Sequence, residues 1–443
     1  MEAVWADMAL TELPSWVTDV PPNWGTAARG KLSANNWRVI CTVHLPITLI
    51  RLWGGDDTPE YWKDILENFM DLVRAVQIAN LRSISKKEIK LYEHYIFRYV
   101  TNFKSLYKLA KVKPIHHAAL HYGDILRGFG PAHTHGGAFY ERYIHSMQSK
   151  NHNMKFGLWL DFRLDVVSSS SLSLSGELES TFMHSSVREA NLQALLLDDS
   201  EVRSRVGNLV KVYENIRAED VRGTRLAHMV DAVCLTQQGH NLVYDGTHLC
   251  ETSLPDSALI PFIQLLKRKK QATGDTTSLD SPPGMAMRPG VKLLDKFSFR
   301  GVQYSTAKFR ARNSHIFFEH HQTDAPNAPS QPEPGQIISI FLHSSVPTPH
   351  TTSPKHGPLQ SDLYLCVRPY LSLQPELSNM DQMYRRFGFA GGFLCRRELA
   401  PLIIIEPSSI ISHVAVTPLL IKEHQVLHIL PMDRVCLSSY LKT

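Results

Sequence analysis

Histidine and carboxylate side chains gather in one stretch of the sequence, residues 114–141. Imidazole and carboxylate groups are the side chains that bind metals or transfer protons. His117 and His121 are four residues apart, so on a helix both rings would lie on one face, as a metal site requires. With two further histidines they make up the candidate metal ligands: His117, His121, His133 and His135.

Two interpretations of this stretch stay open. Either the histidines bind a metal, or they are hydrogen-bonded surface residues, which is the commoner role of histidine in a short helix. Glu141 would be a metal ligand if two more carboxylates converged on it, and it would otherwise pair with a neighbouring arginine or lysine. No cysteine stands beside the histidines at the spacing of a zinc site.

Short basic clusters are the second group of candidate functional residues. They lie at 267–270 (KRKK), 308–312, 385–386 and 396–397. The last two flank FGFAGGFLC, so we expect a glycine-containing hairpin whose guanidinium groups contact phosphates and whose phenylalanines stack. The candidate DNA contacts are therefore Arg385, Arg386, Arg396, Arg397, Lys308, Arg310 and Arg312. The alternative is that each cluster is a solvated surface, and KRKK also has the composition of a nuclear import signal.

Composition places the chain among intracellular globular proteins. Its 443 residues are 43% hydrophobic and carry a net charge of +5, which permits nucleic-acid binding without establishing it. The six cysteines lie far apart, as is typical of a reducing compartment. No apolar run approaches about 18 residues and no basic leader is present, so we expect a nuclear or cytoplasmic protein without membrane contact. P-loop, nucleophile-elbow and HExxH motifs are absent from the sequence.

Hydrophobic periodicity predicts that the first part of the chain is helical. Apolar residues recur every three or four positions over 64–82 and again over 85–112, where Ser85 and Glu88 have the spacing of a capping box. Pro46 should kink or break an apolar helix, and another helix should begin at Pro114 and end near Arg127. Similar patterns predict helices at 139–149, 202–216 and 254–270.

Beyond residue 290 the pattern changes to short β-branched and aromatic runs between turn residues, which predict seven strands in a small barrel or sandwich. The segment 271–290 is rich in Gly, Pro, Ser and Thr and predicts a linker. We therefore predict an α+β protein with a mainly helical domain over 1–270 and a β-rich, autonomous domain over 291–443. The serine-rich segment 158–176 predicts an inserted loop.

Long blocks of the chain resemble the C-terminal region of CACTA-type (En/Spm-like) transposases of basidiomycete fungi. The N-terminal blocks are LPSWVTDVPPNWGTAARGKLSANNWRVICTVHLPITLIRLWG, NFMDLVRAVQIAN and HHAALHYGDILRGFGPAHTHGGAFYERY, and the C-terminal ones include FRGVQYST, PGQIISIFLH and LCVRPY. In the family NMKFG runs directly into ELES, whereas here 158–176 intervenes, as a retained intron or an insertion would.

The resemblance implies an RNase-H-like core in which three acidic residues hold two divalent metals, with Glu141 of the block YERY as the third acid. The family's two aspartates belong to a region upstream of the blocks resembled here. The resemblance thus implies a catalytically incomplete transposase fragment that binds DNA or a transposase core polypeptide. We expect no cofactor for this chain alone, and Mg²⁺ where a complete site is assembled. The alternatives are a metal-dependent nuclease or recombinase using Glu141, and a protein-interaction module built on the β-rich domain.

Overall fold

The chain combines helices with an antiparallel sheet, which confirms the predicted α+β class. The computed structural model describes residues 1–27, 30–135, 137, 242–244, 250–273, 290–320, 331–344 and 361–432, with a few residues between 183 and 192. Two compact units are present: Met1–Ala132 with Thr224–Thr443, and His133–Gly223. The predicted helices at 139–149 and 202–216 and the segment 158–176 lie outside the described residues.

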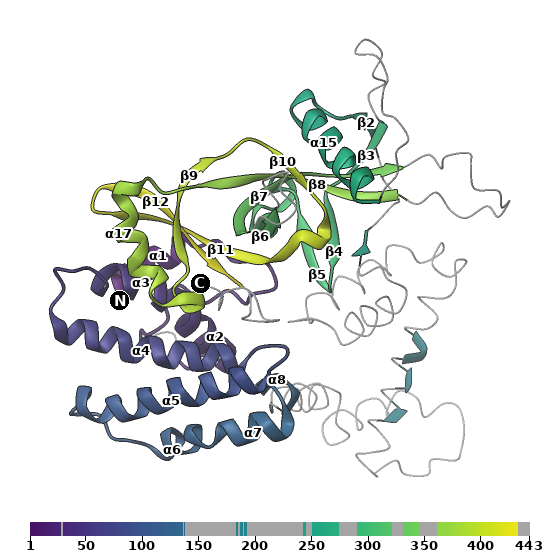
Figure 1. The fold of residues 1–443 in the computed structure, drawn as a ribbon. Helices are drawn as coiled ribbons and strands as arrows, with labels where there is room; N and C mark the ends of the chain where they lie inside the picture. The colour runs from purple at the N-terminus through teal and green to yellow at the C-terminus, as the bar shows by residue number, and fades with distance from the viewer. Residues whose placement is uncertain are drawn as a thin grey trace, which may run out of the picture. The chain divides into compact units, whose positions relative to one another are not determined.

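The N-terminal part of the first unit is built from helices. They are α1 (Glu2–Leu10), α2 (Ala34–Val39), the π-helix η1 (Ile40–His44), α3 (Leu45–Trp53), α4 (Glu60–Ala79), α5 (Lys86–Leu106), α6 (Pro114–Leu120), α7 (Tyr122–Phe129) and, at the junction of the units, α8 (Ala132–His135). Figure 1 shows α4, α5 and the α6–α7 pair as successive layers, with α4 nearest the strands. None of the described helices has both the length and the apolar character needed to cross a bilayer.

The two long amphipathic helices that periodicity predicts are present as α4 and α5. One face of α4 carries Leu66 and Met70 into the core that the helices share with the strands. Its other face carries Ile78 into a second core with Ile89 and Ile96 of α5. Because apolar residues cover two faces of α4, this helix is buried between α5 and the sheet.

Helix ends follow some of the sequence signals and depart from others. The Ser85 hydroxyl and the Glu88 carboxylate exchange hydrogen bonds with each other's backbone N–H, which confirms the capping box at the start of α5. Pro46 lies in the first turn of α3, where its missing N–H removes one helical hydrogen bond. The π-helix η1, which directly precedes α3, accommodates this change, so the chain stays helical from Ala34 to Trp53. The helix predicted from Pro114 to Arg127 is instead divided at His121 into α6 and α7.

Six strands close into an antiparallel barrel. They are β6 (His315–His320), β7 (Gln331–Ser344), β8 (Ser361–Ser372), β9 (Phe393–Leu399), β11 (Ile410–Ile421) and β12 (His424–Pro431). Neighbours pair in the order β8-β9-β12-β11-β6-β7, and β7 pairs with β8 to complete the circle. This closure selects the barrel over the sandwich.

Additional strands and short helices surround the barrel. β10 (Ile403–Ile405) pairs with β8, β3 (Gly290–Leu294) with β7, and β2 (Cys250–Ser253) with β3. A separate small sheet holds β1 (Leu242–Val243), β4 (Lys296–Phe299) and β5 (Val302–Ser305). The short helices are α16 (Ala307–Arg310) and α17 (Ser378–Arg385).

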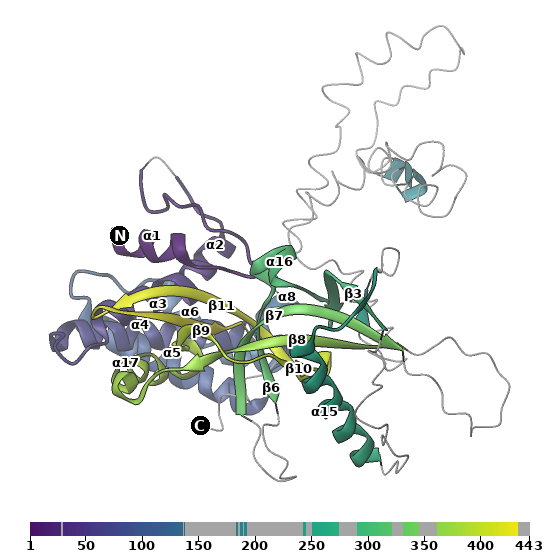
Figure 2. The ribbon, with the colours of Figure 1, turned by 90° about the horizontal axis from the view of Figure 1, so that it is seen from above.

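Helix α15 (Asp256–Thr273) confirms the helix predicted at 254–270 and covers the outer strands, as Figure 2 shows. Its Ala258 and Phe262 pack against Phe341 of β7 and Tyr364 of β8. The chain segment before the predicted linker is therefore part of the same packed structure as the strands that follow the linker.

The N-terminal segment also packs on the barrel. Leu13 and Val17 share one hydrophobic core with Leu394 of β9 and with side chains of α3 and α4. Glu12 forms an antiparallel β-bridge with Val416 of β11, with N···O distances of 2.8 and 3.1 Å. Helices and barrel thus belong to one compact unit, which differs from the division that the sequence predicts at the linker.

Candidate functional site

The structure brings one pair of the candidate metal ligands together. His117 in α6 and His121 at the break before α7 are both exposed, and their Nε2 atoms lie 3.3 Å apart. His133 and His135 lie on α8, in the second compact unit. Within the described ranges, no group of three or more His, Cys, Asp or Glu side chains is placed to hold a metal ion.

Glu141, the candidate third acid of a transposase site, lies outside the described residues. The nuclease interpretation therefore stays a prediction from the sequence.

The basic cluster at 308–312 contributes partly to packing. The Nε of Arg312 donates to the carbonyl of Leu13 at 2.7 Å, and its guanidinium forms an ion pair with Asp19. Arg312 thus fastens the N-terminal segment to the barrel and has an internal counter-charge. Lys308 and Arg310, by contrast, are exposed on α16.

The prediction of a hairpin between the two arginine pairs is wrong. Arg385 and Arg386 stand at the end of α17, a short 3-10 turn follows, and the chain then enters β9. The glycines serve close packing instead of a β-turn: a Cβ on Gly392, which has φ +70°, would clash with the carbonyl oxygen of Ile429 in β12. The sequence pattern of aromatic residues and glycines was compatible with either geometry.

The arginines of α17 have carboxylate and aromatic partners. Arg385 forms an ion pair with Asp381 one turn earlier and lies 4.8 Å from the centre of the Phe393 ring. Arg386 lies 4.6 Å from the centre of the Phe387 ring, with Glu67 of α4 at 3.9 Å. Part of the positive charge at this end of α17 is therefore compensated within the chain.

The arginines of β8 and β9 have neutral partners. Arg396 donates to the carbonyl of Ser372 at 3.1 Å, and Arg397 donates to the side-chain carbonyl of Gln425 at 3.0 Å. Arg368 of β8, which the sequence analysis did not single out, donates to two backbone carbonyls at the end of β9. In the part of the chain that the structure describes, none of the three forms an ion pair, so their charges remain uncompensated.

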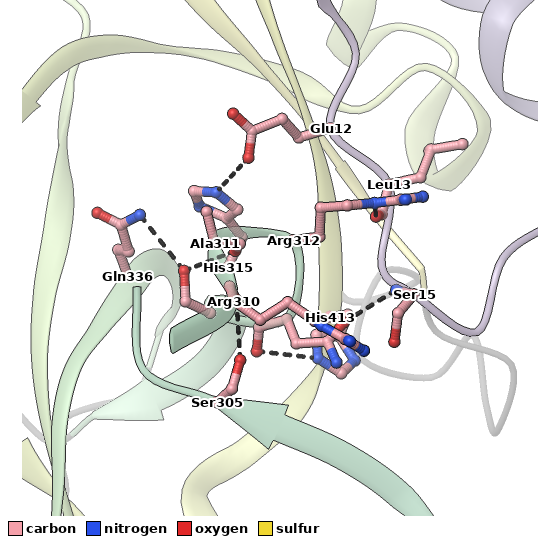
Figure 3. Close-up of polar contacts among 12 residues, drawn as sticks. Glu12, Leu13, Ser15, Ser305, Arg310, Ala311, Arg312, His315, Gln336 and His413 are labelled. Carbon is pink, nitrogen blue, oxygen red and sulfur yellow. Dashed lines mark hydrogen bonds and ion pairs between the residues drawn. The ribbon is translucent and has the colours of Figure 1, made fainter. Parts of the chain in front are cut away.

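A polar cluster joins the N-terminal segment to the barrel (Figure 3). At its centre is His315 of β6, which is 5% exposed. Its Nε2 lies 3.2 Å from a carboxylate oxygen of Glu12, and its Nδ1 lies 2.8 Å from the hydroxyl of Tyr370 in β8. The hydrogen bond with His315 lowers the pKa of the Glu12 carboxyl.

A second buried histidine, His413 of β11, completes this cluster. Its Nδ1 accepts a hydrogen bond from the indole N–H of Trp16 at 3.3 Å, so Nε2 carries the ring proton and faces the Asn313 carbonyl at 3.3 Å. The ring stacks on Tyr304 with a centroid separation of 4.2 Å. Burial lowers the pKa of His413 to about 3, so it is neutral at physiological pH.

The chain Glu12–His315–Tyr370 has the connectivity of a catalytic acid–base relay. A nucleophilic tyrosine would need a lowered pKa, whereas burial raises the pKa of the Tyr370 hydroxyl. The cluster is better explained as a set of polar contacts that hold the N-terminal segment against the barrel. Sequence reasoning missed it because its hydrogen-bonded partners lie 55 to 397 residues apart and carry no local pattern.

Comparison of the chain with protein-family models, with curated proteins and with solved structures gives no match.

Proposed function

We propose that the chain is the non-catalytic, DNA-binding part of a transposase-derived protein, and that it contacts the phosphate backbone through arginines of β8 and β9. The observation that carries the proposal is that Arg368, Arg396 and Arg397 are oriented by neutral oxygens and not by carboxylates. The resemblance to CACTA-type transposases supports DNA over other polyanions.

The partners of each arginine determine how readily it meets a phosphate. A guanidinium has five N–H donors, and Arg396 and Arg397 each use one of them in the hydrogen bonds described above. Its remaining donors can form charge-assisted bonds to a phosphate without breaking an ion pair. Arg385 must first exchange its Asp381 carboxylate for the phosphate, so its net gain is smaller.

The negative charge of the neighbouring Glu398 would oppose phosphate binding at Arg397. It is exposed on β9 directly after Arg397, but it forms no ion pair with either arginine of that strand among the described residues. Successive side chains of a strand point to opposite faces, so Glu398 shares a face with Arg396 and is directed away from Arg397. Arg397 is therefore the strongest single candidate for a phosphate contact.

The test measures binding of a labelled duplex by fluorescence anisotropy over a series of salt concentrations. The variant Arg397→Gln should bind more weakly and flatten the plot of log affinity against log salt by about 0.9, since each phosphate that an arginine neutralises adds ~0.9 to the slope. The matched control, Arg385→Gln, removes the same charge from α17 and should keep most of the slope. Equal slopes in wild type and the β9 variant, or a larger decrease in the control, would contradict the proposal.

The absence of catalysis is tested on the same preparations. One carboxylate cannot hold two divalent ions at the roughly 4 Å separation of two-metal catalysis, so we expect no DNA cleavage with Mg²⁺ or Mn²⁺. Cleavage that Glu141→Gln abolishes would establish the nuclease alternative. If the wild type binds no DNA even at low salt, the protein-interaction module becomes the better hypothesis.

A further inference from the structure

We infer that His117 and His121 form a chelating site for one divalent transition-metal ion, with Zn²⁺ as the reference ion. The inference is independent of the DNA-binding proposal, because both side chains lie on the α6–α7 layer and not on the barrel. It differs from the Mg²⁺ chemistry of transposases, because two imidazoles favour Zn²⁺, Ni²⁺ or Cu²⁺ over Mg²⁺.

The separation of the two nitrogens fits the coordination geometry. Two imidazole nitrogens bound to tetrahedral Zn²⁺ at about 2.0–2.1 Å lie about 3.3–3.4 Å from each other. The Nε2 atoms of His117 and His121 are 3.3 Å apart, with ring centroids 4.8 Å apart and the rings inclined by 72°. The distance between the two nitrogens therefore already matches chelation, and the rings need to turn only until both lone pairs point to one ion.

The break between α6 and α7 accounts for this arrangement. His117 lies in the last turn of α6. The backbone N–H of His121 donates to the carbonyl of Ala118, which tightens the chain after this turn. The neighbouring His116 is directed elsewhere, since its Nδ1 accepts the backbone N–H of Lys113 and its ring packs 4.7 Å from Phe103. The three histidines of this segment thus divide into one capping residue and one pair.

Ligand protonation sets the conditions of binding. In the metal-free pair one Nε2–H donates to the other Nε2, so binding requires that proton to move to Nδ1 of the same ring through solvent. Both Nε2 lone pairs then bind the ion, and no net proton is released. Both side chains are exposed, so water can complete the coordination shell of the ion.

The experiment titrates the full chain with Zn²⁺, and in parallel with Mg²⁺, by isothermal titration calorimetry. The chain has 22 histidines, so the decisive quantity is a difference between variants. We expect His117→Gln/His121→Gln to lose one bound Zn²⁺ per chain, while the matched control His116→Gln keeps it. Mg²⁺ should give no heat that depends on these residues.

A spectroscopic measurement separates chelation from a change in folding. With one equivalent of Cu²⁺, the electron paramagnetic resonance spectrum of the wild type should show hyperfine coupling to two imidazole nitrogens, and single His121→Gln should show one. The same Zn²⁺ stoichiometry in the double variant and the wild type, or a Cu²⁺ spectrum unchanged by His121→Gln, would overturn the inference. Loss of DNA binding alone would leave it intact.

Discussion

Protonation of His413 should destabilise the protein in mild acid. Burial lowers its pKa from 6.5 to about 3, because the enclosed ring has no water to stabilise its charged form, and this outweighs the hydrogen bond to the Asn313 carbonyl, which favours that form. The folded-state pKa lies below the unfolded one, so the unfolded chain binds the extra proton first. The stabilisation is therefore present above about pH 6.5 and is lost as the pH falls towards the folded-state value.

The size of the effect follows from the two pKa values. Between roughly pH 7 and pH 5 the unfolded state takes up most of one proton at His413 while the folded state takes up almost none. At about 1.4 kcal/mol for each pKa unit, this lowers the free energy of unfolding by about 2 kcal/mol. His44 and His428, whose pKa values burial lowers to about 4, should add to the loss in the same direction.

Urea denaturation followed by circular dichroism at both pH values measures this quantity. His413→Gln keeps a donor and an acceptor but cannot titrate, so it should be less stable at neutral pH and show a pH dependence smaller by about 2 kcal/mol. Leu13→Ala is the control: it should cost about 2–5 kcal/mol at both pH values, because Leu13 is buried in the shared core but does not titrate. If His413→Gln and wild type lose the same free energy on acidification, the assignment of a neutral, hydrogen-bonded His413 fails.

Three further outcomes follow from the packing. The fragment 291–443 should unfold without a cooperative transition by circular dichroism, because its barrel shares cores with the N-terminal helices and with α15, and a sharp transition would restore the autonomous domain that the sequence predicts. Asp71→Ala should lower the urea midpoint by the equivalent of about 3–5 kcal/mol, because it leaves buried Arg74 without its carboxylate; an unchanged midpoint would show that water already serves this pair. Gly392→Ala should cost about 1–3 kcal/mol from its positive φ alone, before the clash with Ile429, and a neutral effect in the same assay would exclude this turn geometry.

Local signals in the sequence located most elements. The spacing of Ser85 and Glu88 identifies the start of α5 because a capping box depends only on neighbours in the chain. Strands with alternating or β-branched patterns were likewise predicted, and barrel closure was one of two stated outcomes. The start of a helix and the position of a strand depend on residues close to one another in sequence, whereas barrel closure joins distant strands such as β6 and β11.

Contacts between segments that are distant in the sequence could not be predicted from local patterns. β9 contains Arg396 and Arg397 and no clear alternation, so the sequence suggests the flank of a hairpin there. From the sequence, Arg312 was predicted to be a DNA contact, because no neighbouring residue indicates that it binds the distant Leu13 carbonyl. Among the candidate metal ligands, His117 and His121 have the four-residue spacing that places two side chains on one face of a helix, and their Nε2 atoms lie 3.3 Å apart in the structure.

The contact between the N-terminal segment and β11 has a consequence for synthesis on the ribosome. Thr11 and Thr417, whose hydroxyls lie 3.0 Å apart, are separated by 406 positions in the sequence. At about 5–20 residues per second, translation needs roughly 20–80 s between the emergence of the first and the second. Throughout that interval Leu13, Val17 and the strand-facing side of α4 have no barrel to pack against, so the nascent chain presents an apolar surface that chaperones can recognise.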